Sequence, residues 1–315
     1  MTSGTLLVTA RQMADCRQEI EEATGGALAV RYEPPPEGRQ QHDRETMRGL
    51  LAEASAAVVG DDHIDAYAIS ESNRLRLVVK WGIGIDSIDV KALAARDIGL
   101  RNTPGLFGPE VAEVAMAYLI VLFRRLFDVH ERVREGTWHK PLGRSLTGRS
   151  LLVVGYGTVG SAVATRAAAF GLRVTVHDPN PEALRAARLA GFGVAALDEG
   201  LPDADALVVC CTPLPDNRPL LDAGRLARCR AGAVIVNVAR GSLIDEEALA
   251  RALSAGSIAG AGLDTYAVEP LPAGAAIREA PNVIFGAHNG SYADEAVARA
   301  NRAVLEILRA EIRDR

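Results

Sequence analysis

The chain has 315 residues, about twice the length of a typical single domain, so two compact units are expected. Hydrophobic residues make up 48% of it and charged residues 24%, which is ordinary for a globular protein that buries its core without disulfides or metal. The formal net charge of −5 gives no overall attraction to nucleic acid or to an anionic membrane, so neither is expected as a partner.

The cysteines and the first residues bear on the cellular compartment. Cys16, Cys210, Cys211 and Cys229 form no CxxC pair and no cysteine–histidine pattern, so we expect a reducing compartment, without a disulfide framework or a metal site. The start of the chain lacks the basic region and long apolar core of a signal peptide. The longest apolar run, residues 114–123, is too short to cross a bilayer. A cytoplasmic location is therefore expected.

In the first hundred residues, short apolar runs alternate with polar, helix-like stretches. Strands are predicted at 5–9, 28–32, 56–59 and 77–79, and a helix is predicted over 11–22. Strands that alternate with helices indicate a parallel sheet with helices on its faces. A turn-rich segment at 102–105, Asn-Thr-Pro-Gly, then interrupts the pattern.

A helix is predicted over 109–128. Pro109 occupies a position where helices begin, and Glu110 and Glu113 suit the positive end of such a helix. The segment is apolar around most of its circumference, which is typical of a helix buried on several sides. Two interpretations stay open: burial within its own subunit, or an interface between subunits.

A second series of strands and helices begins at residue 151. Strands are predicted at 151–154, 173–177, 206–210, 233–238, 260–263 and 283–285, and helices at 160–170 and 246–255. Six strands in about 135 residues have the length and order of a complete doubly wound dinucleotide-binding domain.

Residues 155–160, with the sequence GYGTVG, match the pattern G-x-G-x-x-G. The pattern alone is weak evidence, but here it directly follows an apolar strand and opens a helix of small residues, as dinucleotide binding requires. Gly155 permits a tight turn, Gly157 lets the backbone approach a pyrophosphate, and Gly160 allows the helix to pack closely on the strand. The start of the helix offers unpaired N–H groups to the phosphates.

Asp178 ends the next predicted strand, 18 residues after Gly160. A carboxylate at this position can accept hydrogen bonds from both hydroxyls of the adenosine ribose and would repel a 2′-phosphate. Pro179 and Asn180 follow, so no adjacent cation compensates. NAD is therefore favoured over NADP as the cofactor; the alternative is a solvated aspartate at the end of a strand.

Three polar residues in the last third of the chain each follow an apolar strand: Arg240, Glu269 and His288. Ligands of a doubly wound sheet gather at the carboxyl ends of its strands, so these three side chains are expected to converge near the nicotinamide. Each alone also has a structural interpretation, as a surface ion pair, a turn or a structural histidine. Their joint placement favours a catalytic site.

The chemistry of the three side chains suits hydride transfer. Arg240 can bind a substrate carboxylate through two hydrogen bonds and polarise a neighbouring carbonyl. His288 can give a proton to the carbonyl oxygen as hydride arrives, or take one from an alcohol in reverse. Glu269 can hydrogen-bond the far imidazole nitrogen, fix its orientation and favour the protonated form.

Further motifs occur along nearly the whole chain. They are KWGIGID at 80–86, NTPG at 102–105, VAE at 111–113, the glycine motif, VARG at 238–241 with Asp245, Glu246 and Leu249, LD at 263–264 with Glu269-Pro270, and His288 with Gly290. With these motifs the chain resembles the D-isomer-specific 2-hydroxyacid dehydrogenases, the family of D-3-phosphoglycerate, D-lactate and glyoxylate/hydroxypyruvate reductases. It is most similar to the short, phosphoglycerate-dehydrogenase-like form without a regulatory domain.

The resemblance implies an α/β fold of two doubly wound parallel-sheet domains. An NAD-binding Rossmann domain, 103–288, would be inserted into a flavodoxin-like catalytic domain made of 1–102 and 289–315, with hinges near 102–104 and just after His288. The implied activity is the NAD-dependent interconversion of a D-2-hydroxy acid and its 2-oxo acid. Arg240, Glu269 and His288 match the catalytic set. Relatives are usually homodimers, held partly by the helix that corresponds to 109–128.

The resemblance also implies binding residues. The residues that match NAD contacts are Gly155, Gly157, Thr158, Val159, Gly160, Asp178, Thr212, Pro213, Val238, Ala239, Asp264 and Gly290. The loop Gly82-Ile83-Gly84 matches the loop whose N–H groups bind the substrate carboxylate, together with Arg240 and His288. Lys80 stands where phosphoglycerate-oxidising relatives often carry a basic residue, which indicates a phosphorylated or phosphono substrate; the alternative is a solvated lysine at the end of a strand.

The chain departs from the family pattern around His288. The usual proline before this histidine is Ala287, and Asn289 follows where apolar or small residues are common, which bears on the hinge and on the pocket over the nicotinamide. The sequence ends at Arg315, soon after its last predicted helix, so a regulatory extension and control by serine through it are not expected.

Two other functions are considered. A non-catalytic NAD-sensing protein of the corepressor kind shares the fold and these residues, so it stays open as an alternative. Formate oxidation is disfavoured, because those relatives carry Gln at the position of Glu269.

Overall fold

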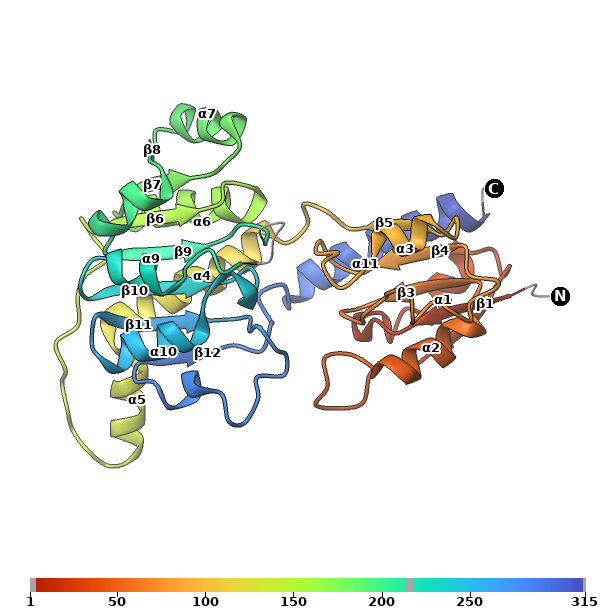
Figure 1. The fold of residues 1–315 in the computed structure, drawn as a ribbon, viewed down its shortest axis with the longest axis horizontal. Helices are drawn as coiled ribbons and strands as arrows, with labels where there is room; N and C mark the ends of the chain where they lie inside the picture. Colours follow the sequence, from red (N-terminus) through yellow and green to blue (C-terminus); the bar gives the residue numbers. More distant parts are fainter. Residues whose placement is uncertain (1–3, 214–217, 314–315) are drawn as a thin grey trace. The chain divides into compact units, whose positions relative to one another are not determined.

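The computed structural model describes residues 4–213 and 218–313. The chain divides into two compact units (Figure 1). The first unit consists of Met1–Leu106 and Ala293–Arg315, and the second of Phe107–Tyr292. The chain passes from one unit to the other twice, and each passage lies a few residues beyond the boundary expected from the sequence.

The first unit contains a parallel sheet with the strand order β2-β1-β3-β4-β5 among the described residues. Its strands are β1 (Thr5–Val8), β2 (Ala29–Tyr32), β3 (Ala56–Val59), β4 (Leu77–Lys80) and β5 (Gly99–Asn102). Its helices are η1 (Arg11–Met13), α1 (Arg17–Ala23), α2 (Arg44–Ala52), α3 (Val90–Ala94), α11 (Asp294–Leu308) and η5 (Arg309–Arg313). This strand order is that of flavodoxin-like folds.

The core of the first unit lies on both faces of this sheet. Every residue of β3 and β4 is buried, and all but Lys80 at the end of β4 are apolar, as in a parallel sheet covered on both sides. The last long helix, α11, packs against α1 and η1. On α11, Asn301 accepts a hydrogen bond from the indole of Trp81 at 2.8 Å and donates one to the carbonyl of Gln12 at 2.8 Å. The end of the chain therefore completes the first unit.

The second unit contains a parallel sheet with the order β12-β11-β10-β9-β6-β7-β8 among the described residues. Its strands are β6 (Ser150–Val154), β7 (Arg173–His177), β8 (Gly193–Val194), β9 (Ala206–Val209), β10 (Ala233–Asn237), β11 (Ile258–Leu263) and β12 (Val283–Phe285). Its helices are α4 (Gly108–Arg124), α5 (Leu126–Arg134), α6 (Thr158–Ala169), α7 (Pro181–Leu189), α8 (Leu197–Gly200), α9 (Ala223–Arg228) and α10 (Glu246–Ser254), with short turns η2 (Leu201–Asp203), η3 (Gly241–Leu243) and η4 (Ala276–Glu279). Helices α4 and α6 pack together against one face of the sheet, and α9 and α10 cover the other (Figure 1).

Two predicted helices are interrupted in the structure. The helix predicted over 11–22 is a short 3-10 turn, η1, followed after a break by α1. The helix predicted over 109–128 ends at Arg124, because Arg125 adopts a left-handed conformation with φ +54° that stops the helix before α5 begins. Strands β5 and β8 were not predicted; β8 has two residues, too few for an alternating pattern.

The described residues include no helix that is both long enough and apolar enough to span a membrane.

Candidate active site

The glycine motif forms the turn between β6 and α6. Gly155 has φ +94°, a conformation that favours glycine, and a Cβ there would lie 2.8 Å from the backbone of Cys211. A Cβ on Gly160 would overlap the carbonyl oxygen of Gly155, so glycine is required for α6 to approach the strand. A Cβ on Gly157 would meet nothing within 4 Å. The backbone at Gly157 therefore faces open space at the start of α6.

Asp178 follows β7 and holds this turn. Its Oδ2 accepts a hydrogen bond from the N–H of Tyr156 at 2.7 Å, and its Oδ1 accepts one from the N–H of Asn180 at 2.8 Å. Each carboxylate oxygen can accept a second hydrogen bond. The carboxylate is therefore fixed beside the open turn and can still bind hydroxyl groups.

The other predicted cofactor contacts lie at the carboxyl ends of strands of the same sheet. Thr158 and Val159 begin α6, Thr212 and Pro213 follow β9, and Val238 and Ala239 follow β10. An open glycine turn at a helix N-terminus, with a carboxylate beside it, fits the pyrophosphate and the ribose of NAD.

His288 and Glu269 form a hydrogen-bonded pair in the second unit. Nδ1 of His288 lies 2.8 Å from Oε2 of Glu269, and the other glutamate oxygen accepts a hydrogen bond from the N–H of Tyr266 at 2.9 Å. The two side chains are 26% and 20% exposed. The carboxylate is thus anchored to the backbone on one side and orients the imidazole on the other.

The backbone around His288 is fixed by Asp264. The carbonyl of Asp264 accepts a hydrogen bond from the N–H of His288 at 2.7 Å, and its carboxylate accepts hydrogen bonds from the N–H groups of Asn289 at 3.2 Å and Gly290 at 2.9 Å. His288 has φ +53°, a left-handed conformation that is uncommon for residues other than glycine. Asp264, predicted as a cofactor contact, is buried and orders the loop that carries the histidine.

The two departures from the family pattern contact each other. The N–H of Ala287, a group that proline lacks, donates a hydrogen bond to the side-chain Oδ1 of Asn289 at 3.1 Å. Asn289 also donates its own N–H to Asp264. The side chain of Asn289 therefore restrains the backbone before His288, and its own N–H restrains the backbone after it.

Arg240 lies in a loop after β10 that packs on the turn at Tyr266. Buried Asn237 accepts a hydrogen bond from the N–H of Ala239 at 3.0 Å and donates one to the carbonyl of Arg240 at 2.8 Å. A Cβ on Gly241 would overlap the backbone of Tyr266, so only glycine allows this approach. Sequence reasoning missed the roles of Asn237 and Gly241, although Gly241 lies within the motif that contains Arg240 and Asn237 directly precedes it.

Glu246, the first residue of α10, is a second carboxylate near the Glu269 turn. Its Oε1 accepts a hydrogen bond from the N–H of Ala267 at 2.6 Å, whereas Glu269 accepts one from the preceding residue, Tyr266. Burial raises the pKa of Glu246, and the like charge of Glu269 adds to the effect. Two carboxylates therefore hold two consecutive N–H groups of one turn.

In the first unit, the predicted substrate loop follows β4. Gly82 has φ +120°, and its N–H donates a hydrogen bond to Oγ1 of buried Thr103 at 2.9 Å. Asn102 donates a hydrogen bond from its side chain to the carbonyl of Ile83 at 2.8 Å. The N–H of Gly82 is thus used within the fold. In the described part of the chain, the N–H groups of Ile83 and Gly84 have no such acceptor.

Lys80, the last residue of β4, is 4% exposed. Its Nζ donates hydrogen bonds to Oδ1 of Asp61 at 2.9 Å and to the carbonyl of Trp81 at 3.0 Å. The other oxygen of Asp61 accepts a hydrogen bond from the side chain of Gln40 at 2.8 Å. The alternative of a solvated lysine at the strand end is therefore wrong, because the ammonium is buried and paired.

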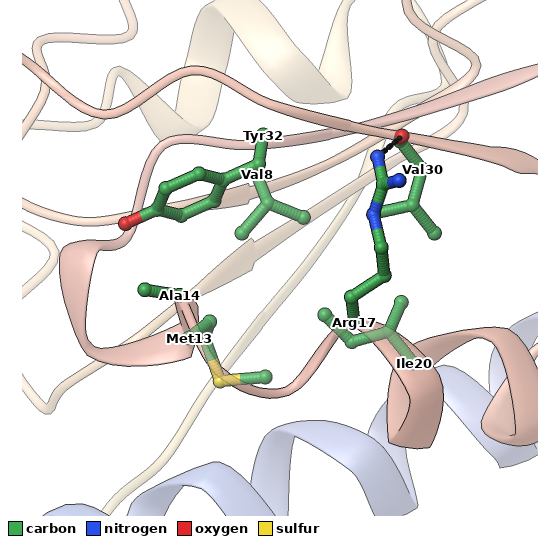
Figure 2. A pocket seen from close by; sticks show the side chains of 7 residues that line it. All are labelled: Val8, Met13, Ala14, Arg17, Ile20, Val30 and Tyr32. Carbon is green, nitrogen blue, oxygen red and sulfur yellow. Dashed lines mark hydrogen bonds between the residues drawn. The ribbon is translucent and has the colours of Figure 1, made fainter.

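A separate cavity of about 260 Å³ lies in the first unit between β1, β2 and α1 (Figure 2). Its lining residues are Val8, Met13, Ala14, Arg17, Ile20, Val30 and Tyr32. The guanidinium of Arg17 donates a hydrogen bond to the carbonyl of Val30 at 3.0 Å, as Figure 2 shows. None of the predicted site residues lines this cavity, so it is not part of the candidate active site.

The sequence profile of the D-isomer specific 2-hydroxyacid dehydrogenase NAD binding domain matches residues 116–290. The chain belongs to this family. It is 35% identical over 290 residues to a D-3-phosphoglycerate dehydrogenase of Mycobacterium tuberculosis, covering 91% of this chain and 53% of the relative. It is 34% identical over 253 residues to a glyoxylate reductase of Korarchaeum cryptofilum, covering 78% of this chain and 76% of the relative. The chain thus spans about half the length of the curated phosphoglycerate dehydrogenases that it matches.

Solved structures share the fold over the whole chain. The crystal structure of a glyoxylate reductase from Paecilomyes thermophila superimposes with a TM-score of 0.84 at 27% sequence identity, covering 99% of this chain and 96% of that chain. These comparisons confirm the predicted family, the α/β fold with two parallel sheets, and NAD as the cofactor.

Proposed function

We propose that the protein is an NAD-dependent oxidoreductase that interconverts a D-2-hydroxy acid and its 2-oxo acid. The observation that carries this proposal is the 2.8 Å contact between His288 and Glu269, in a loop whose backbone is ordered by buried Asp264. A histidine oriented by a carboxylate at the carboxyl edge of a dinucleotide-binding sheet suits proton transfer coupled to hydride transfer.

Glu269, His288 and Arg240 each have a separate role in the proposed reaction. The bound cofactor supplies the site that gives or accepts the hydride. Glu269 occupies Nδ1 of His288, so Nε2 is the atom that takes the proton of the substrate hydroxyl and returns it in the reductive direction. The neighbouring carboxylate stabilises the imidazolium that forms. Arg240 binds the substrate carboxylate. In the first unit, the N–H groups of Ile83 and Gly84 are further donors suited to a carboxylate.

Turnover of 2-oxo acids tests the proposal against the alternative of an NAD-sensing protein. The purified protein should oxidise NADH, followed at 340 nm, when it is supplied with glyoxylate, pyruvate or hydroxypyruvate. Tight binding of NADH without turnover of any acid in this panel would favour the sensor. The expectation of a phosphorylated or phosphono substrate rests on Lys80, and the pairing of Lys80 with Asp61 weighs against it.

We also propose a homodimer, with an interface that differs in detail from the one expected. Most apolar side chains of α4 are buried within the second unit. Large exposed apolar side chains follow it, on α5 and the segment after it: Leu126, Phe127, Val133, Trp138 and Leu142. Trp138 and Leu142 are 80% and 95% exposed. Exposed apolar side chains grouped along one segment mark an interaction surface.

A cytoplasmic location is proposed on separate grounds. Each of the four cysteines, all in the described part of the chain, is a free thiol, as in proteins of a reducing compartment.

A further inference from the structure

We propose that Thr103 is a positioning residue for substrate binding: its hydroxyl and its backbone N–H hold the loop Gly82-Ile83-Gly84 in the shape that binds the substrate carboxylate. This inference deepens the proposed function and rests on it, because the carboxylate belongs to the substrate of that reaction. It is carried by hydrogen bonds that all lie within the first unit.

Thr103 and Gly82 exchange two hydrogen bonds. Thr103 directly follows β5, and Gly82 lies two residues after the neighbouring strand, β4. The N–H of Gly82 donates to Oγ1 of Thr103 at 2.9 Å, and the N–H of Thr103 donates to the carbonyl of Gly82 at 3.1 Å. Both residues are buried. Loss of the hydroxyl would therefore leave a buried N–H without its acceptor, which is unfavourable.

Three consecutive carbonyls at the start of the loop accept hydrogen bonds from the first unit. The donors are Nζ of Lys80 for Trp81 at 3.0 Å, the N–H of Thr103 for Gly82 at 3.1 Å, and the side chain of Asn102 for Ile83 at 2.8 Å. In a planar trans peptide, a carbonyl and the N–H of the next residue point in opposite directions. The N–H groups of Ile83 and Gly84 therefore point away from the end of β5.

These two N–H groups are available to a ligand. Neither has an acceptor within the described ranges of the chain, and Ile83 is 38% exposed whereas Gly82 is buried. Successive backbone N–H groups in a turn bind anions such as a carboxylate. Glycine has more backbone freedom than other residues, so the shape of a loop with two glycines depends on its partners. Thr103 is the partner that holds Gly82 through both its N–H and its carbonyl.

Two variants of Thr103 separate the hydroxyl from the shape of the side chain. Thr103→Val keeps the branching but replaces the hydroxyl with a methyl group, so KM should rise at least tenfold for whichever of glyoxylate, pyruvate or hydroxypyruvate the wild type reduces. The kcat should fall less than threefold and the dissociation constant for NADH should stay within twofold, because the second unit holds the cofactor and the acid–base pair. Thr103→Ser restores the hydroxyl and should return KM to within threefold of the wild type.

Thr24→Val is the matched control for a loss of stability. Thr24 is a buried threonine of the same unit, and its hydroxyl donates a hydrogen bond to the carbonyl of Ile20 at 3.0 Å, at the end of α1. Its replacement should lower the melting temperature, as in Thr103→Val, but leave KM unchanged. An unchanged KM in Thr103→Val, or an equal rise in Thr103→Ser or Thr24→Val, would overturn the inference and leave the proposed function standing.

Binding of oxamate gives a measurement that does not depend on turnover. Oxamate is an analogue of pyruvate that carries the carboxylate but is not reduced. Its dissociation constant from the complex with NADH, followed by the quenching of NADH fluorescence, should rise at least tenfold in Thr103→Val and stay within threefold of the wild type in Thr103→Ser. Equal constants in Thr103→Val and the wild type, or no binding to the wild type, would contradict the role of Thr103. If the protein reduces no 2-oxo acid, the proposed function is refuted and the oxamate constants alone decide this role.

Discussion

At the scale of single residues, His288 is restrained through both its side chain and its backbone. Glu269 fixes the ring, and Asp264 fixes the N–H groups of three consecutive residues. Restraint of this kind is what a general acid–base group needs, because the proton must be delivered to one atom at one position.

Replacement of this histidine is the direct test of its role. His288→Ala should lower kcat for a 2-oxo acid by roughly two to four powers of ten, the usual contribution of a general acid–base group. The dissociation constant for NADH, measured by fluorescence titration, should change little, since the imidazole is not proposed to hold the cofactor. Turnover close to that of the wild type would remove His288 from the mechanism.

The Ala287–Asn289 contact predicts a compensating pair of changes. Asn289→Ala removes the acceptor of the Ala287 N–H and should lower kcat several-fold by loosening the backbone around His288. Adding Ala287→Pro removes the unpaired N–H and restrains the backbone through the proline ring, so the double variant should recover most of the lost kcat. If the double variant is as slow as the single variant, the hydrogen bond is not the relevant restraint.

The charge of Asp178 predicts the choice of cofactor. Asp178→Asn keeps an acceptor for the Tyr156 N–H, so the glycine turn should persist, but it removes the charge that would repel a 2′-phosphate. The ratio of kcat/KM for NADH to that for NADPH should fall at least tenfold. The assignment of Asp178 to the ribose is wrong if this ratio stays constant while the protein keeps its thermal stability.

At the scale of elements, the sequence predicts best where periodicity and chain order coincide. Ten of the twelve described strands were predicted, because each of the ten is a short apolar run. Strand β5 has the mixed sequence GLRN, β8 has only two residues, and the end of α4 is set by the backbone of Arg125. Site residues at strand ends were predictable, because topology places strand ends on one edge. The partner of Lys80 was not predictable, because Asp61 follows a different strand. Only the register of β3 with β4 brings the two residues together.

Glu246, the first residue of α10, is expected to make the stability of the folded protein depend on pH. Burial raises the pKa of Glu246 in the folded protein, so the folded state favours the protonated acid, and stability is lost as the pH rises through the raised pKa. Glu246→Gln imitates the protonated acid and can still accept the Ala267 N–H. Its melting temperature should therefore exceed that of the wild type by about 1–3 °C at neutral pH.

The difference between Glu246→Gln and the wild type should shrink as the pH falls toward about 4, where the wild-type carboxyl becomes protonated. Glu247→Gln, at the neighbouring position with a side chain that is 83% exposed, is the control and should melt like the wild type at both pH values. A wild-type protein that is more stable than Glu246→Gln at neutral pH would contradict the raised pKa.

At the scale of the whole molecule, each unit buries the central strands of its own sheet, and one group of exposed apolar side chains follows α4. Helix α5 has no buried residue, although Leu126, Phe127 and Val133 are among its nine residues. A helix of this kind gains little stability from its own subunit, because an apolar face stabilises a helix only when it is covered. A second copy of the chain would supply that cover.

The prediction for assembly follows from this surface. The wild-type protein should sediment as a species of about twice 33.3 kDa at micromolar concentration. The double variant Phe127→Glu, Trp138→Ser should sediment as a monomer, because it places a charge and removes a large apolar side chain where the partner is expected. Leu189→Ser is the matched control: this leucine is 81% exposed on α7 of the same unit, away from α5 in sequence, and its loss should leave the dimer intact. A wild-type protein that sediments as a monomer would exclude the dimer. A double variant that stays dimeric would place the interface elsewhere.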